Sequence, residues 1–171
     1  HSANNMTETI AALTALANCD CVERKTAIDG FYDKWRNESL VIDKWLTVQT
    51  TSRLPDTFTQ VQDLMQHEAF DIKNPNKVRA VIGGFCHGNH AGFHAADGRG
   101  YEFATDQVIA LDLINPQIAA RLARSFDRWR KFDLERQRHA RSGLERIRAT
   151  EGLSKDTFEV VSNALAENNS S

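Results

Sequence analysis

Apolar side chains recur every three to four residues along almost the whole chain, and no stretch alternates apolar and polar residues as a half-buried strand does. This spacing places apolar residues on one face of a helix. The 171 residues include 9 glycines and 3 prolines, so helix breakers are few. The pattern predicts an all-α fold.

Helix boundaries are marked most clearly by Asn74-Pro75 and Asn115-Pro116, where asparagine can cap free backbone amides and proline suits the first helical position. We predict a capping role for Ser154 as well. The expected helices cover residues 6–17, 22–36, 40–49, 56–66, 75–85, 101–113, 116–132 with a break near Ser125, 133–150, and a last helix after Ser154.

About nine short antiparallel helices without a strict repeat predict an irregular superhelical (solenoid-like) array. We expect one domain over residues 1–171, with a frayed polar tail at 167–171. Because the chain opens at His1 and its first methionine is Met6, we expect it to be a piece of a larger protein.

Charge and cysteine content give few clues to function. Lys+Arg 21 against Asp+Glu 23 leaves a net charge of -2, which does not favour a generally basic nucleic-acid binder. No apolar run approaches the roughly 20 residues of a membrane helix. Three cysteines, at Cys19, Cys21 and Cys86, make a disulfide framework unexpected and fit a reducing compartment.

The stretch CHGNHAGFHAADG, residues 86–98, gathers one cysteine and three histidines, which are usual zinc ligands. His90 and His94 are four residues apart, as paired ligands on a helix would be. Gly88 and Gly92 instead favour a loop, in which we expect His94 and Asp97 to hold backbone amides and carbonyls before Tyr101. The metal site stays open as the alternative.

Two other patterns suggest chemistry less strongly. QHEAFD, residues 66–71, begins like the zincin signature HExxH but has Asp71 in place of the second histidine, so His67 is expected to interact with a helix terminus. Residues 115–149 hold nine arginines and Lys131 against four acids. Arginines along helices can bind nucleic-acid phosphates, but a solvated helix face with ion pairs is the simpler interpretation.

Residues 74–137 resemble the C-terminal domain of bacterial aminopeptidase N, a gluzincin-type zinc metallopeptidase family. The most specific matches are FHAADGRGY at 93–101 and NPQIAAR at 115–121. The opening residues and the stretches 32–52 and 152–166 resemble the same family in the same order, so the similarity covers essentially the whole chain.

The resemblance implies a fold and a role. The family's last domain is an all-α superhelical array that packs against the catalytic domain and encloses the active-site cavity, where short peptides are the substrates. Its zinc, HExxH helix and catalytic tyrosine lie in an earlier domain. We therefore expect no catalytic or metal-binding residue in this chain and no activity from the chain alone, while the parent would be a cytoplasmic zinc aminopeptidase.

Residue roles are carried over only at matching motif positions. By the resemblance, Gln117 and Arg121 of NPQIAAR contact the substrate from this domain, and Arg79 of NPNKVR faces the cavity. An amide and a guanidinium can hydrogen-bond substrate within a largely apolar pocket. The alternative is a free-standing helical module whose arginine-rich face binds nucleic acid or an acidic partner; we expect neither nucleic acid nor membrane among the partners.

Overall fold

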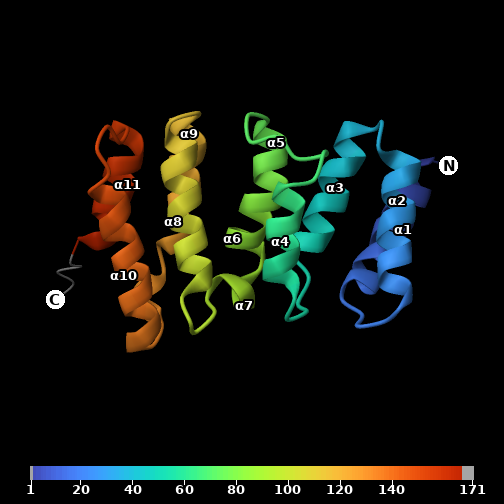
Figure 1. Ribbon diagram of the computed structural model, residues 1–171, viewed down its shortest axis with the longest axis horizontal. Coiled ribbons are helices and arrows are strands. Elements are labelled where there is room, and N and C mark those ends of the chain that lie inside the picture. The colour runs from blue at the N-terminus through green and yellow to red at the C-terminus, as the bar shows by residue number, and fades with distance from the viewer. Residues whose placement is uncertain (1, 167–171) are drawn as a thin grey trace. The chain divides into compact units, whose positions relative to one another are not determined.

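Helices form every regular element of residues 2–166, the part of the chain that the structure, a computed structural model, describes (Figure 1). The expected all-α class is confirmed. Contacts group the chain into two compact units, residues 1–92 and 93–171. The predicted frayed tail at 167–171 lies outside the described residues, and the single domain stays a prediction.

The first unit is organised around α3, which packs against its neighbours in sequence and against the helical stretch that follows α4. Its core includes Trp45, which donates its indole N–H to the carbonyl of Ile28 at 2.9 Å. The elements are α1 (Ser2–Ala17), α2 (Glu23–Trp35), α3 (Ser39–Thr50), α4 (Thr57–Met65), α5 (Pro75–Val78), a π-helical turn (Arg79–Gly83), α6 (Gly84–Gly88) and α7 (His90–Phe93), whose last residue opens the second unit.

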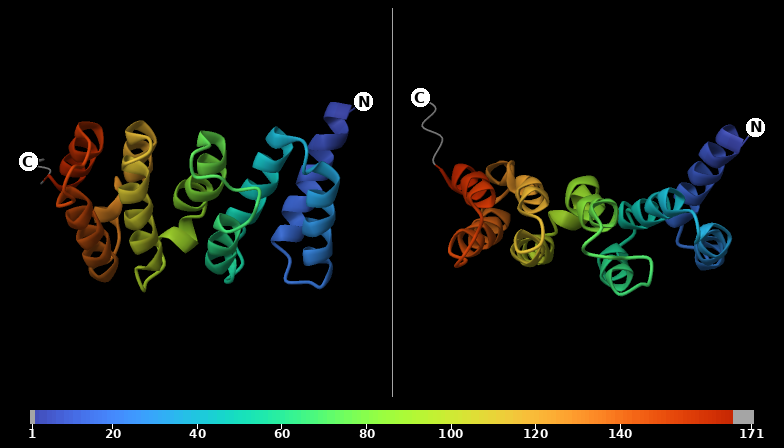
Figure 2. Two further views of the ribbon diagram at one scale, coloured as in Figure 1. Left: turned by 45° about the horizontal axis from the view of Figure 1, so that its top comes forward. Right: turned by 90° about the horizontal axis from the view of Figure 1, so that it is seen from above.

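The second unit packs four helices in pairs: α8 contacts α9 and α10, and α11 contacts α9 and α10 (Figures 1 and 2). Phe93, Tyr101 and Phe126 form an edge-to-face and tilted aromatic cluster in its core, with ring centroids 5.2 to 5.8 Å apart. The elements are α8 (Arg99–Asp112), α9 (Pro116–Ala123), 3-10 turns at Arg124–Phe126 and Trp129–Lys131, α10 (Leu134–Arg148) and α11 (Lys155–Leu165).

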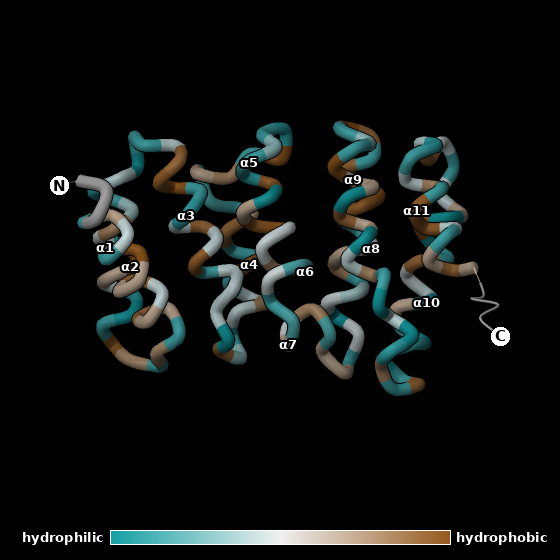
Figure 3. The backbone as a smooth tube through the Cα atoms, turned by 180° about the vertical axis from the view of Figure 1, so that it is seen from behind, coloured by the Kyte–Doolittle hydropathy of each residue, from teal (hydrophilic) through white to brown (hydrophobic). Residues whose placement is uncertain are grey.

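One-sided burial explains these helices. Brown and teal segments are interspersed along the helices in Figure 3, as expected where one face meets the core and the other meets solvent. The side chains of Asn74, Asn115 and Ser154 accept hydrogen bonds from backbone amides of the first turns of α5, α9 and α11. The three predicted caps are confirmed, and so is the break near Ser125, which lies in a 3-10 turn.

The loop predicted around residues 86–98 is wrong in part, because Gly84–Gly88 and His90–Phe93 are helical. The glycines are needed for close packing rather than for a flexible connection. A Cβ on Gly92 would lie 2.8 Å from the ring of Phe85, and one on Gly100 would overlap the carbonyl of Phe93. Asn89 separates the two short helices and accepts the Gly92 N–H at 3.0 Å.

Candidate functional site

Helix α9 carries the two predicted substrate residues on its exposed face. Asn115 caps the helix, Pro116 occupies its first position, and Ala119, Ala120, Leu122 and Ala123 bury the opposite face. Gln117 and Arg121 are spaced by four residues, so they lie one above the other on the same side. Both are exposed.

A groove of about 480 Å³ lies beside this face, between α9 and α11. Gln117 and Arg121 line it together, so the structure brings these two predicted residues into one site. Sequence reasoning missed the other polar groups of the groove. They are Arg124, after α9, and three residues of α11, Asp156, Glu159 and Asn163.

The missed residues of α11 did carry a sequence signal. Positions 156, 159, 160 and 163 recur at helical spacing, which places them on one face opposite the buried Thr157, Val161 and Leu165. Nothing in the sequence, however, shows which helix this face meets. The groove therefore offers guanidinium and amide donors from the α9 side and carboxylate acceptors from α11, a set suited to binding a polar ligand.

Asp112 fixes the position of α11 along this groove. Its carboxylate accepts hydrogen bonds from the backbone N–H of Ser154 at 2.7 Å and from the hydroxyls of Ser154 and Thr157, each at 2.5 Å. Asp112 and Thr157 are buried. The bonds join the end of α8 to the first turn of α11, and thereby hold one wall of the groove.

Arg79, the third predicted residue, lies in the first unit as the first residue of the π-turn. Its guanidinium is exposed and donates to the Asn76 side chain at 3.3 Å. Lys77, two residues earlier, is buried instead, with its ammonium 2.6 Å from Asp43 and 3.1 Å from the carbonyl of Ser39. Of these two basic side chains, only that of Arg79 is open to a ligand.

The CHGNHAGFHAADG stretch does not form a metal site. Burial raises the pKa of the Cys86 thiol well above its usual range, so no thiolate is available there. His94 Nδ1 lies 2.6 Å from the hydroxyl of Tyr101, and burial raises the pKa of Tyr101 to about 12. Within residues 2–166, no group of three or more histidine, cysteine, aspartate or glutamate side chains could hold a metal ion.

The expectation for the end of this stretch is confirmed for Asp97, whereas for His94 it stays a prediction. Asp97 accepts the backbone N–H of Arg99 at 3.1 Å and its Nε at 2.6 Å, and these bonds from Arg99 lower the pKa of the Asp97 carboxyl. The His94 ring bonds the Tyr101 side chain and stacks on Phe132. The core hydroxyl of Tyr101 competes for this ring, which sequence spacing does not reveal.

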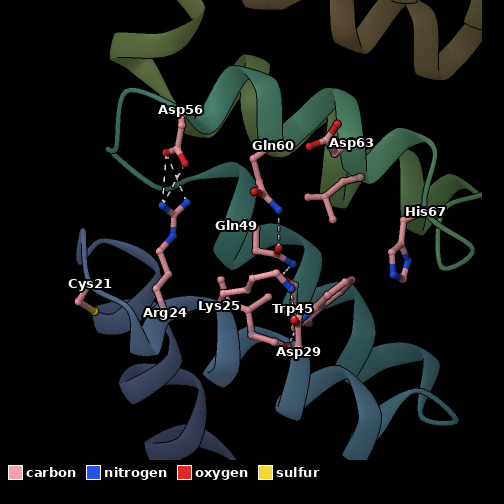
Figure 4. Close-up of a pocket in the computed structure, with 12 residues that line it drawn as sticks. Cys21, Arg24, Lys25, Asp29, Trp45, Gln49, Asp56, Gln60, Asp63 and His67 are labelled. Atoms are coloured by element: carbon pink, nitrogen blue, oxygen red, sulfur yellow. Dashed lines mark hydrogen bonds and ion pairs between the residues drawn. The ribbon is translucent and has the colours of Figure 1, made fainter.

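A second hollow, of about 450 Å³, lies in the first unit between α2, α3 and α4 (Figure 4). Its polar groups largely pair with one another: Arg24 with Asp56 at 3.1 Å, and the Gln60 amide with Gln49 at 3.0 Å. His67, from the zincin-like motif, lies at its edge and accepts the N–H of Ala69 at 3.1 Å in the turn after α4. These internal pairs leave fewer of its polar groups to contact a ligand.

Much of the arginine-rich segment is used in contacts within the chain. Arg130 donates to the carbonyls of Ala164, Leu165 and Ala166 at 2.7 to 3.0 Å and so closes the C-terminal end of α11. Arg136 pairs with Asp133 and Arg146 with Asp106. The interpretation as a helix face with ion pairs is consistent with these contacts.

These features define the class: an all-α array of helices with a polar groove and no metal-ligand cluster within its described residues. The chain belongs to the family described as domain of unknown function (DUF3458_C) ARM repeats, which matches residues 1–166. The family confirms the expected solenoid-like class of helical array.

The relatives of the chain are aminopeptidases. It is 40% identical over 166 residues to aminopeptidase N of Escherichia coli (strain K12), covering 97% of this chain and 19% of that protein. Aminopeptidase N of Haemophilus influenzae is 40% identical over 165 residues, covering 96% of this chain and 19% of the relative. The similarity is to the C-terminal region, as the sequence resemblance predicts.

A solved structure is similar over the same extent. The crystal structure of Legionella pneumophila aminopeptidase A in complex with aspartic acid matches with a TM-score of 0.86 and 36% identity, covering 94% of this chain and 19% of that one. The chain thus spans about a fifth of the length of these relatives. Within residues 2–166, no helix combines the length and apolar character needed to cross a membrane.

Proposed function

We propose that this chain is the C-terminal helical domain of a longer bacterial zinc aminopeptidase, which removes N-terminal amino acids from short peptides. The observation that carries the proposal is the groove between α9 and α11, where Gln117 and Arg121 lie together on one exposed face. The family membership and the 40% identity to aminopeptidase N support it.

The role of the domain is to bind and enclose rather than to react. It would pack against the catalytic domain of the same polypeptide, close one side of the active-site cavity and reduce the access of bulk water. Gln117 and Arg121, with Arg79 from the first unit, would hydrogen-bond the substrate or ordered water around it. The zinc and the groups that cleave the peptide bond would come from elsewhere in the polypeptide, in the cytoplasm.

Substitutions in the groove test this proposal in the enzyme that contains the chain. Gln117→Ala and Arg121→Ala should change the relative KM for substrates with different N-terminal side chains, roughly tenfold for Arg121, because one hydrogen bond to a charged group is lost. Steady-state kinetics on a panel of aminoacyl p-nitroanilides measures the change, and zinc content is measured on the same samples.

Arg148→Ala, at the exposed end of α10, is the matched control and should leave the preference unchanged. Equal loss of rate on every substrate, accompanied by loss of zinc, would contradict a binding role for the groove. The chain by itself, supplied with zinc, should release no amino acid, and robust zinc-dependent release would contradict a non-catalytic domain.

A further inference from the structure

The helical stretch that carries Arg79 contains one π-turn between two α-helical segments. In an α-helix the Gly84 N–H would bond to the carbonyl of Ala80, four residues back. Here it donates to the carbonyls of Arg79, five residues back, and Val81, three residues back. Such single π-turns insert an extra residue into a helix and occur frequently at functional sites.

Thr50 of α3 supplies a reason for the turn. It is fully buried, and its hydroxyl oxygen lies 3.1 Å from the Ala80 carbonyl and 3.2 Å from the carbonyl of Thr47 in its own helix. A threonine hydroxyl has one hydrogen to donate, so a bond to Ala80 is made in competition with the local one. The Ala80 carbonyl, which an α-helix would pair with the Gly84 N–H, thus receives its hydrogen bond from Thr50 instead.

Gly84 provides the space for this contact. A Cβ built on Gly84 would lie 2.5 Å from the Thr50 hydroxyl oxygen, so a side chain there would force the hydroxyl to move. Thr50 and Gly84 therefore form a matched pair: the hydroxyl reaches the helix because residue 84 has no side chain, and the helix accepts it because Ala80 has a free carbonyl.

Both ends of the stretch are fixed to α3 or to the residues just after it. At the start, the Lys77 ammonium bonds Asp43 and Ser39. At the end, the Asn89 amide donates to the carbonyls of Thr50 at 3.1 Å and Ser52 at 2.9 Å. With both ends held, the extra residue is accommodated between them, at the π-turn.

We infer that Thr50 and Gly84 are positioning residues for Arg79, acting through the π-turn that starts at that arginine. Loss of the turn would change the helical register by one residue, which rotates the side chains before and after it by about 100° relative to each other. Arg79, which lies over Gly83 and reaches Asn76, would then point elsewhere. The consequence for substrate binding rests on the proposed role of Arg79.

Thr50→Val tests the inference because valine has a similar shape and no hydroxyl. Thr50→Ser keeps the hydroxyl and serves as the conservative variant. Thr51→Val is the matched control, since the hydroxyl of Thr51, the residue after α3, donates to the carbonyl of Thr47 and not to the π-turn. Crystal structures of the chain variants should show the turn returned to α-helical register and the Arg79 guanidinium displaced in Thr50→Val, with both retained in Thr50→Ser and Thr51→Val. An unchanged turn and an unmoved Arg79 in Thr50→Val would overturn the inference.

Kinetics of the enzyme that contains the chain test the consequence. Thr50→Val should raise KM about tenfold with little change in kcat, like Arg79→Ala, and the double variant should be no worse than Arg79→Ala alone. A KM raised by Arg79→Ala but not by Thr50→Val would overturn the positioning role. If the turn changes in the crystal while Arg79→Ala leaves KM unaltered, the proposed role of Arg79 fails and positioning by Thr50 stands.

Thr50→Ala is the second variant if Thr50→Val does not fold, judged by its helical circular dichroism. It removes the hydroxyl and leaves more space in the core, and the same displacement of Arg79 is expected. Retention of the π-turn in a folded Thr50→Ala protein counts against the inference in the same way.

Discussion

At the residue scale, the buried carboxylate of Asp112 fixes the position of α11, which forms one wall of the groove between α9 and α11. It is 6% exposed and accepts three hydrogen bonds from the residues that begin α11. A buried polar group of this kind stabilises a fold only while all its partners are in place. The wall of the groove that carries Glu159 therefore depends on Asp112.

Asp112→Asn should lower the free energy of unfolding by about 2 kcal/mol. The asparagine side chain replaces one acceptor oxygen with an NH2 group, which would face the N–H and hydroxyl donors of Ser154 and Thr157. Urea denaturation of the chain, followed by circular dichroism, measures the loss. Asp106→Asn is the control, since the pair of Asp106 with Arg146 is exposed and should contribute less than about 1 kcal/mol. Equal losses in the two variants would contradict a special role for Asp112.

Asp133, the N-cap of α10, should make the stability depend on acid pH. Hydrogen bonds from the Arg136 backbone N–H, and then from its guanidinium, lower the pKa of the Asp133 carboxyl. Because the folded pKa is lower than the unfolded one, about 3.9, the charge stabilises the fold above that pH and its contribution is lost as pH falls through the folded value.

The difference in unfolding free energy between wild type and Asp133→Asn should therefore be largest near neutral pH and should shrink below about pH 3.9. Urea denaturation at several pH values measures it, with the exposed Asp127→Asn as control. A difference that is constant with pH would show that the charge of Asp133 is not linked to folding.

At the element scale, glycines in helices have opposite roles depending on what surrounds them. Gly30 lies in α2, and beyond its chain neighbours and the nearby backbone of its own helix nothing lies within 4 Å of the position of a Cβ, so it only adds flexibility to the unfolded chain. Gly100, in the first turn of α8, lies directly against the Phe93 carbonyl, and any side chain there would collide with backbone.

Gly30→Ala should raise the unfolding free energy by about 1 kcal/mol, as alanine does for an exposed helical glycine. Gly100→Ala should lower it by more than about 2 kcal/mol, because the backbone of Phe93 must shift. Thermal denaturation should show a higher Tm for Gly30→Ala and a lower Tm for Gly100→Ala. A shift of Tm in the same direction for both would contradict this account.

At the scale of the whole molecule, the charge distribution bears on the alternative function. Of the nine arginines in residues 115–149, ion pairs or hydrogen bonds within the chain involve Arg124, Arg130, Arg136, Arg141 and Arg146. Arg138 and Arg141 line a hollow of about 610 Å³ beside Trp129, where an anionic partner would have to be sought. The net charge of the chain is still -2.

We expect duplex DNA to bind the chain more weakly than about 100 μM at physiological salt, because few arginines are left to neutralise phosphates. Fluorescence anisotropy of a labelled duplex, titrated at low and at physiological salt, measures this. Tight binding that falls steeply with salt and is lost in Arg138→Glu would support the alternative function instead.

The sequence by itself determined most of the helical segments and where most of them begin, because apolar spacing and capping side chains act within a few residues. Asn74, Asn115 and Ser154 cap the helices that their positions predict. It also determined that Gln117 and Arg121 share a face, since their spacing fixes that geometry in any helix.

Tertiary structure decided what depends on residues far apart in the chain. The Ala80 carbonyl in the π-turn is bonded by Thr50, 30 residues earlier, and the wall of the groove opposite α9 is held by Asp112, 42 residues before Ser154. The short helices at residues 84–93 form where glycines allow close packing. Such contacts depend on which faces meet, and local spacing carries no information about that choice.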